Sequence, residues 1–295
     1  MTIWKTLENK EELSQTELLA GLIDEADSIV VGIGAGMSAA TGFVYTGPRF
    51  TDVFPDFIEK YNFYDMLQAF VFTDWESPEE MWAFKSRFAK LNYFDQGEGL
   101  AYTQLREVLD NKDHHVITTN ADTAFYRSHY DMDKVFRIQG EYGLLQCSEF
   151  CHQQAYPLNP EWNQEMVDKQ KDMKIPTEIM PTCPRCGAPL EVNKRDTYKG
   201  MVEDPDFHRQ EKLYYDYLDA HEGEKTLYLE SGVGTTTPQF IRDPFQKMTC
   251  ENPNALYVTM NRKPYRVAPE VRDQTVRITE DIADIFAGVN AQLVH

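Results

Sequence analysis

A glycine-rich turn after an apolar run is the first feature that could do chemistry. Its residues are Gly34, Ala35, Gly36, Met37 and Ser38. Glycines there would let backbone N–H groups approach a pyrophosphate at the start of a helix. A tight strand-to-helix turn is the alternative explanation. Ala39 holds the third glycine position of a dinucleotide fingerprint, and no clear acidic residue ends a second strand about 20 positions on, so a hydride-transferring dehydrogenase fits poorly.

Four of the five cysteines form two close pairs that suit a metal. The pairs are Cys147 with Cys151 and Cys183 with Cys186. Where no secretion signal precedes them, paired cysteines indicate a metal site rather than disulfides. Four thiolates suit tetrahedral zinc and leave no open position for catalysis, so we expect structural Zn²⁺. His152 is a spare candidate ligand, and Cys250 is expected to be a buried small apolar residue.

Short apolar, β-branched runs alternate with helix formers along most of the chain. We expect strands at 28–33, 115–119, 134–138, 225–230, 254–259 and 275–278. We expect helices at 10–26, 75–92, 98–110, 205–221 and 280–289. This alternation predicts an α/β fold of the Rossmann type, in which helices cover both faces of a doubly wound parallel sheet.

The amino-acid composition of the chain changes between residues 141 and 203. Cysteine pairs, prolines and polar residues dominate there, and apolar periodicity is weak. We therefore expect a small inserted zinc-binding module at 141–203. The Rossmann-type domain is expected to consist of residues 1–140 and 204–295.

Polar residues and glycines follow directly on five of the predicted strands. They are the Gly34 turn, Asn120, Gln139, Gly232 and Asn261. Ligands of parallel α/β sheets bind beyond the carboxyl ends of the strands, so we expect these five positions to converge on one crevice. Taken alone, Asn120 could instead cap a helix that begins at Ala121, and Asn261 could start a turn.

The strong negative charge of the chain argues against one class of partner. The formal net charge is −19 and the pI about 4.7, so the surface repels polyphosphate and we expect no nucleic-acid binding. The longest apolar stretch, 28–37, is too short to span a bilayer, and no cationic leader opens the chain. We therefore expect a cytoplasmic protein without membrane contacts.

Several of these motifs together resemble the sirtuin family. Sirtuins carry G-A-G-x-S-x-x-S-G, then T-Q-N-x-D followed by H-G, two cysteine pairs, G-S-G-T-S and I-N. The corresponding segments here are 34–42, 118–122, Gln139-Gly140, the cysteine quartet, 231–237 and Asn261. The resemblance spans about residues 20–290, and it implies NAD as co-substrate of the Rossmann-type domain.

The resemblance also implies roles for the matching residues. Asn120 would orient the reacting ribose and any bound water, and Asp122 would position the nicotinamide carboxamide. Arg49 would supply the family's arginine from a longer loop, with Phe50 or Tyr45 as aromatic cover. The implied NAD-binding set is Gly34, Ala35, Gly36, Ser38, Arg49, Asn120, Asp122, Gln139, Ser231, Gly232, Gly234, Thr235 and Asn261.

Gln139 stands where the family has the histidine that acts as general base. A carboxamide cannot take up a proton near neutral pH, although it can bond ribose hydroxyls. Deacylation needs that base to activate a ribose hydroxyl, whereas transfer of ADP-ribose to a protein nucleophile does not. His114 and His129 either substitute for the base or merely flank a strand and a helix end.

The strand that holds acyl-lysine in deacylating sirtuins is basic here. Lys194 and Arg195 replace its apolar positions, which indicates either a solvated strand or an acceptor bearing an anionic group. These departures resemble the macrodomain-linked, class M sirtuins, which are protein mono-ADP-ribosyltransferases. That resemblance implies a lipoylated glycine cleavage H-like carrier as acceptor and a macrodomain hydrolase acting on the product. An NAD-dependent lysine deacylase and a non-catalytic NAD or ADP-ribose sensor remain the alternatives.

Overall fold

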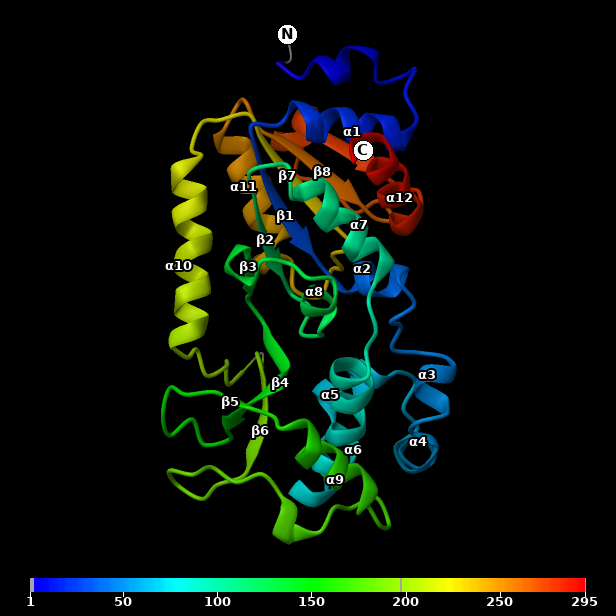
Figure 1. Ribbon diagram of the computed structural model, residues 1–295, viewed down its shortest axis with the longest axis vertical. Helices are drawn as coiled ribbons and strands as arrows, with labels where there is room; N and C mark the ends of the chain where they lie inside the picture. The colour runs from blue at the N-terminus through cyan, green and yellow to red at the C-terminus, as the bar shows by residue number, and fades with distance from the viewer. Residues whose placement is uncertain (1–2, 197, 295) are drawn as a thin grey trace.

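The larger part of the molecule is built on one parallel sheet of six strands (Figure 1). The computed structural model describes residues 3–196 and 198–294. The strand order is β3-β2-β1-β7-β8-β9, and every neighbouring pair is parallel. The strands are β1 Ser28–Ile33, β2 His114–Thr118, β3 Val135–Arg137, β7 Thr226–Ser231, β8 Leu256–Met260 and β9 Thr275–Ile278. The predicted Rossmann-type α/β fold is confirmed.

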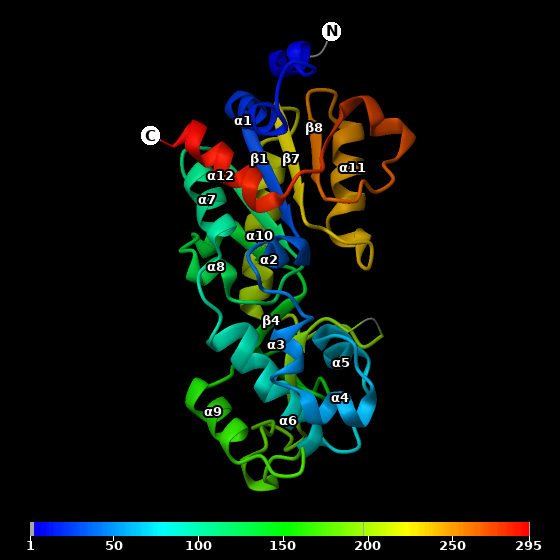
Figure 2. The same cartoon turned by 90° about the vertical axis from the view of Figure 1, so that its right-hand side faces the viewer.

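Helices cover both faces of this sheet, as Figures 1 and 2 show. On one face α1, α7 and α12 enclose a core that includes Leu22, Leu105 and Phe286. On the other face α10 and α11 enclose a core that includes Tyr214 and Phe245. Because both faces are covered, β1, β2, β7 and β8 are buried along their whole length. The helices are α1 Gln15–Glu25, α7 Leu100–Leu109, α10 Pro205–Ala220, α11 Arg242–Glu251 and α12 Ile282–Leu293.

The chain order of the strands reverses between β1 and β7. From β1 the chain proceeds to β2 and β3 on one side, and it returns to β7, β8 and β9 on the other. The loops that leave the two central strands therefore diverge, and in sheets of this kind ligands bind beyond these carboxyl ends. The predicted site residues follow these strand ends.

A smaller unit lies at the other end of the molecule in Figure 1. Its three-stranded antiparallel sheet has the order β5-β4-β6, with β4 Gly140–Cys147, β5 Tyr156–Pro157 and β6 Leu190–Lys194. Five helices accompany this sheet: α3 Pro48–Thr51, α4 Pro55–Tyr61, α5 Met66–Phe72, α6 Pro78–Ala89 and α9 Pro160–Asp168.

The core of the smaller unit is rich in aromatic residues and joins two distant parts of the chain. Phe54, Phe84 and Trp82 from the first part pack in one cluster with Leu145 and Leu190 from the second. The indole N–H of Trp82 donates to the backbone oxygen of Leu190 at 2.9 Å. The division of the chain at 140 and 204 stays a prediction, and residues 50–89 share their core with the module rather than with the large sheet.

The four paired cysteines lie together at one end of this unit. All four Sγ atoms are within 4.8 Å of one another, with 3.5 Å from Cys147 to Cys186 and 3.7 Å from Cys151 to Cys183. A Zn–S bond of about 2.3 Å implies S–S edges of about 3.8 Å in a tetrahedron, so the quartet fits zinc. The ring of His152 instead contacts Cys151 Sγ at 3.0 Å and Tyr156 Oη at 2.6 Å, which places it beside the ligand set.

Two further features of the described residues bear on the expectations from sequence. Cys250 is exposed near the end of α11, so its predicted burial is wrong. Its helix turns this position outward, while the preceding Thr249 is buried. Within 3–196 and 198–294, none of the helices combines the length and apolar character needed to cross a membrane.

Replacing Cys183 by serine tests the metal site. We expect bound zinc to fall from about one ion per chain to near zero, and the unfolding midpoint to drop by at least about 5 °C, because the metal ties together loops with little core of their own. Zinc released by a mercurial reagent, together with thermal unfolding, measures both effects. Cys250→Ser is the matched control and should leave zinc content unchanged; equal zinc in Cys183→Ser would contradict the assignment.

Candidate functional site

Two glycine turns pack backbone against backbone at the carboxyl ends of β1 and β7. The N–H of Gly34 donates to Ser231 O at 3.0 Å, and the N–H of Gly36 donates to Gly232 O at 2.8 Å. A Cβ on Gly36 would lie 2.7 Å from Gly232 Cα, and Gly232 itself has a positive φ of 64°. Glycine is required here because the turns touch, which also leaves a surface without side chains that a phosphate chain can approach.

A buried ion pair stabilises the second glycine loop, residues 231–237. Arg242 Nη2 donates to Glu230 Oε1 at 2.7 Å and to Val233 O at 2.8 Å. The hydroxyl of Tyr257 donates to Glu230 Oε2 at 2.5 Å. Burial raises the pKa of the Tyr257 hydroxyl, and the charge of Glu230 raises it further. Asn261 Nδ2 also donates to Val233 O, at 3.0 Å. Arg242 and Asn261 therefore both fix Val233, which precedes the exposed Gly234 and Thr235.

Sequence reasoning missed this ion pair. Glu230 is fully buried and directly follows the apolar residues Leu227, Tyr228 and Leu229 of β7. A carboxylate at the end of a buried strand needs a partner, and that requirement was the available signal. Nothing in the spacing identifies Arg242 as the partner, because it comes from the next helix.

Asn120 lies at the centre of a hydrogen-bond network under the first glycine turn. Its Nδ2 group donates to Gly34 O at 3.0 Å, to Tyr102 Oη at 2.9 Å and to Ser38 Oγ at 3.2 Å. These contacts fix the orientation of the carboxamide. Among the described residues nothing donates to Oδ1, which leaves that oxygen as an acceptor for a ligand. Helix α8 covers only Ala124–Arg127, so the alternative that Asn120 caps a helix starting at Ala121 is wrong.

Asp122 is joined to the same network through Ser38. The Ser38 hydroxyl donates to Asp122 Oδ2 at 2.7 Å, and the N–H of Ala124 donates to Oδ1 at 3.0 Å. Only 5% of Asp122 is exposed. Burial raises the pKa of its carboxyl, while these hydrogen bonds and the charge of Arg49 lower it. Asp122 is a preorganised buried acid near Arg49.

Arg49 reaches this region from the short helix α3. Its Nη2 group donates at 3.2 Å both to Leu91 O and to Asn92 Oδ1, in a π-helical turn at Lys90–Phe94. Its Nη1 atom is buried and has no partner among the described residues. Burial lowers the pKa of this guanidinium, and the nearby Tyr45 and Asp122 raise it. An unpaired donor beside a buried carboxylate fits a polar ligand.

The two aromatic candidates for cover of the nicotinamide occupy different places. Phe50 is 2% exposed and packs against Phe54, at 5.8 Å between ring centroids. The hydroxyls of Tyr45 and Tyr142 are hydrogen-bonded, with 3.2 Å between their oxygens. Burial raises the pKa of the Tyr45 hydroxyl, and the charge of Asp122 raises it further. Tyr45 is therefore the candidate that faces the network.

Two buried polar residues near this network escaped the sequence analysis. Tyr102 accepts from Asn120 and lies 2.9 Å from Ser38 Oγ. Gln96 has a buried amide whose nitrogen and oxygen both lack a good hydrogen bond to any described residue. That amide still faces Asp122 closely enough to lower its pKa. No motif marks either residue, since both lie far from the strand ends along the chain.

Gln139 connects the large sheet, the smaller unit and the second glycine loop. It lies between β3 and β4 and is 7% exposed. Its Nε2 group donates to Thr237 Oγ1 at 3.1 Å, and its backbone oxygen accepts from the N–H of Arg195 at 3.1 Å. The carboxamide is thus anchored at its nitrogen, on the side of the second loop.

The two histidines named as substitute bases lie in different places. His114 is the first residue of β2, at the opposite end of the strand from Asn120. His129 is exposed after α8, with a positive φ of 58°. His115, also at the amino end of β2, has a pKa lowered to about 4 by burial. These positions favour the structural role of His114 and His129.

The structure brings most of the predicted positions together. One network joins Gly34, Ser38, Asn120 and Asp122, and the two glycine turns add Gly36, Ser231 and Gly232. Three further predicted residues are exposed beside these turns: Ala35, Gly234 and Thr235. The NAD-binding and catalytic roles of these residues stay predictions.

Comparison with known proteins identifies relatives of this chain. No protein-family model matches it. A protein ADP-ribosyltransferase of Staphylococcus aureus strain Mu50 is 54% identical over 276 residues, covering 94% of this chain and 87% of that protein. A probable bifunctional ADP-ribose hydrolase/ADP-ribosyltransferase of Fusarium oxysporum f. sp. cubense is 29% identical over 230 residues, covering 75% of this chain and 38% of that protein.

Solved structures share the fold at low sequence identity. A Sir2 homolog–NAD complex has a TM-score of 0.61 and 16% identity, with 95% of this chain and 94% of that chain covered. A Sir2–p53 peptide–NAD+ complex has a TM-score of 0.60 and 19% identity, with 95% and 98% covered. The chain therefore has the fold of the Sir2 structures, and it belongs to the family of the staphylococcal protein ADP-ribosyltransferase.

Proposed function

We propose that this protein transfers ADP-ribose from NAD to an acceptor protein and releases nicotinamide. The observation that carries the proposal is Gln139, a carboxamide bonded to Thr237 where the sirtuin pattern has a histidine. The activity in the printed name of the staphylococcal relative supports it. NAD is the co-substrate, and the crevice beyond β1, β2 and β7 is its proposed site.

The buried network suits cleavage of the bond between nicotinamide and ribose. That bond breaks with its electron pair leaving on the nicotinamide nitrogen, and positive charge develops at the ribose C1′. Asp122 supplies a nearby carboxylate, and the free Oδ1 of Asn120 supplies a fixed acceptor for the ribose or a bound water. An acceptor nucleophile then forms the new bond to C1′, and positioning alone lowers this barrier substantially.

Gln139 restricts which reaction can follow cleavage of the bond between nicotinamide and ribose. Deacylation would need a base to take the proton from a ribose hydroxyl, and loss of a positioned base costs about 10²–10⁴-fold in rate. Transfer to a protein nucleophile has no such step. Gln139 can still accept from a ribose hydroxyl through Oε1, because its nitrogen is already engaged with Thr237.

The acceptor that we propose is a lipoylated glycine cleavage H-like carrier. A macrodomain hydrolase that removes the modification is the proposed second partner, and the printed name of the Fusarium relative, which combines hydrolase and transferase, supports it. None of the five cysteines forms a disulfide, which suits a reducing compartment, so we propose a cytoplasmic location.

Tracking the adenylate of NAD tests the proposal. The protein is incubated with adenylate-labelled NAD, a lipoylated carrier and an acetyl-lysine peptide. Label fixed on the carrier is the expected result. Label in free O-acyl-ADP-ribose would establish deacylation instead, and NAD binding without release of nicotinamide would favour a sensor.

Asn120→Ala tests the proposed site. The change removes both the fixed acceptor and the donor that orients it, so we expect transfer and nicotinamide release to fall by about 10²–10³-fold. Circular dichroism should show the fold retained. Asn290→Ala in α12 removes bonds to Gln104 and Glu107 away from the crevice and serves as the matched control. Undiminished transfer by Asn120→Ala would refute the site assignment.

Gln139→His separates transfer from deacylation. It restores the family's histidine, yet the basic strand at Lys194 and Arg195 remains, so we expect deacetylation of an acetyl-lysine peptide to rise less than about tenfold. Peptide mass and O-acyl-ADP-ribose provide the measurement. A larger gain would show that only the base was missing, and it would favour the deacylase alternative.

A further inference from the structure

A buried ion pair joins the two strands that lie on either side of Gln139 in the chain. Arg137 is the last residue of β3, Glu141 is the second residue of β4, and their side chains are ion-paired. These side chains are only 10% and 5% exposed. Because the pair links residues four apart, it closes the base of the short segment 138–140, which carries Gln139 at its centre.

Two tyrosine hydroxyls complete the contacts of the Glu141 carboxylate. Tyr93 donates to Oε1, and Tyr126 donates to Oε2 at 3.1 Å. Burial raises the pKa of both tyrosine hydroxyls, and the charge of Glu141 raises it further, so both stay protonated and donate. Arg137 in turn donates through Nε to Gln210 Oε1 of α10 at 3.2 Å. A buried carboxylate with several charge-assisted hydrogen bonds is held in one orientation.

The contact between Tyr93 and Glu141 depends on a glycine of β4. A Cβ on Gly143 would lie 2.2 Å from atoms of the Tyr93 ring, so the ring packs directly against the strand backbone at this glycine. Any other residue at 143 would displace the end of the Tyr93 side chain, which carries the hydroxyl. The strand is therefore built to admit this tyrosine.

The π-helical turn Lys90–Phe94, which carries Tyr93, also contacts residues of the proposed NAD site. Oxygens of the two residues before Tyr93 accept from Arg49 Nη2, and the backbone oxygen of Tyr93 accepts from the hydroxyl of Thr123 at 2.9 Å. Thr123 directly follows Asp122 in the chain. One turn, of a kind that occurs frequently at functional sites, therefore connects this part of the site with the strand that follows Gln139.

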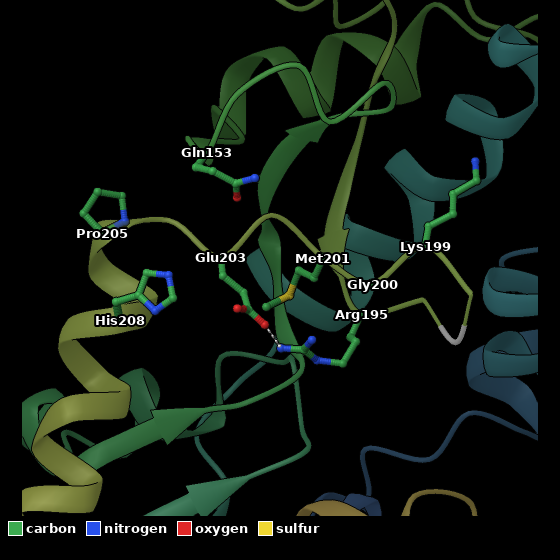
Figure 3. A pocket seen from close by; sticks show the side chains of 8 residues that line it. All are labelled: Gln153, Arg195, Lys199, Gly200, Met201, Glu203, Pro205 and His208. Atoms are coloured by element: carbon green, nitrogen blue, oxygen red, sulfur yellow. Dashed lines mark hydrogen bonds and ion pairs between the residues drawn. The ribbon is translucent and has the colours of Figure 1, made fainter.

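The other side of segment 138–140 is held by a residue that follows β6. Arg195 Nε donates to Ile138 O at 3.2 Å, and its backbone N–H donates to Gln139 O at 3.1 Å. Figure 3 shows the ion pair of Arg195 with Glu203, in which the charged groups are 2.6 Å apart. The backbone of the segment is thus held from two sides, because the ion pair described above closes its base.

We propose that Glu141 and Tyr93 are positioning residues for Gln139 in NAD binding and ADP-ribose transfer. This inference rests on the proposed transferase function. Tyr93 fixes the Glu141 carboxylate, the carboxylate pairs with Arg137, and the pair sets the backbone from which the Gln139 carboxamide projects. Misplacing a group that contacts substrate by about 1 Å can cost about 10²-fold in rate, so this support acts on function as well as on stability.

A double-mutant cycle on NAD affinity tests the positioning role. Glu141→Gln, Gln139→Ala and the double variant are titrated with NAD by calorimetry. We expect Glu141→Gln to weaken NAD binding at least about threefold alone and less than about 1.5-fold in the Gln139→Ala background, because the group that it positions is then absent. Equal weakening in both backgrounds, or no weakening in either, would overturn the proposal.

Glu80→Gln in α6 is the matched control. Glu80 is also a buried carboxylate that accepts from a cation and from a tyrosine hydroxyl, Lys60 at 2.6 Å and Tyr61 at 2.9 Å. Both glutamine variants should lower the unfolding midpoint, but Glu80→Gln should leave NAD affinity unchanged. Equal loss of affinity in the two variants would mean that Glu141 acts only on stability. Tyr93→Phe keeps the ring against Gly143, and it should show the same coupling if Glu141→Gln does not fold.

The transfer reaction separates this inference from the proposed function. With saturating adenylate-labelled NAD and a lipoylated carrier as probe, Glu141→Gln should lower kcat at least about fivefold, whereas Glu80→Gln should leave it within about twofold. Coupled NAD affinities without label on the carrier in any protein would refute the transferase function alone. Label transfer with uncoupled NAD affinities, or with kcat unchanged in Glu141→Gln, would refute the positioning role alone.

Discussion

The contact between the two glycine turns constrains everything around it. Gly36 and Gly232 approach so closely that a single Cβ on either would collide with backbone. This contact lies where the strand order reverses, so it sets how far the loops beyond β1 and β7 can separate. The Nδ2 group of Asn120 donates to Gly34 O in the first of these turns. The ion pair of Glu230 and Arg242 stabilises the loop after β7. The carboxyl ends of β1 and β7 therefore meet in a tightly packed surface built from backbone, with few side chains to rearrange.

Much of this arrangement follows from the sequence because it depends on strand ends. Asn120, Gln139, Gly232 and Asn261 each follow a short apolar run, and parallel strands bring such positions to one edge. The cysteine quartet was equally accessible, since spacing alone indicates a metal. The alternative role of Asn120 as a helix cap fails because Asn120 precedes a non-helical stretch, in which Asp122 bonds the backbone of Ala124.

Other features depend on contacts between residues far apart in the chain and could not be read locally. The aromatic helices between Pro48 and Ala89 show an ordinary apolar pattern, which does not say which partner they bury against. In the structure they share a core with β4 and β6. The partners of Arg242 and Tyr102 cannot be predicted from the sequence either, because each residue contacts its partner only in the tertiary fold. Local patterns predict elements and their ends, whereas the choice of neighbours is a property of the whole chain.

Strand β4 carries Gln139 just before its first residue and the zinc ligand Cys147 as its last. Gln139 and the metal site thus lie at the two ends of one strand, whose register with β6 shifts between Gly140 and Leu145. Thiolates are the form that oxidants attack, and their loss would release the metal and free the far end of the strand. Oxidation of the quartet would therefore loosen the strand that begins beside Gln139, although the thiolates lie at its opposite end.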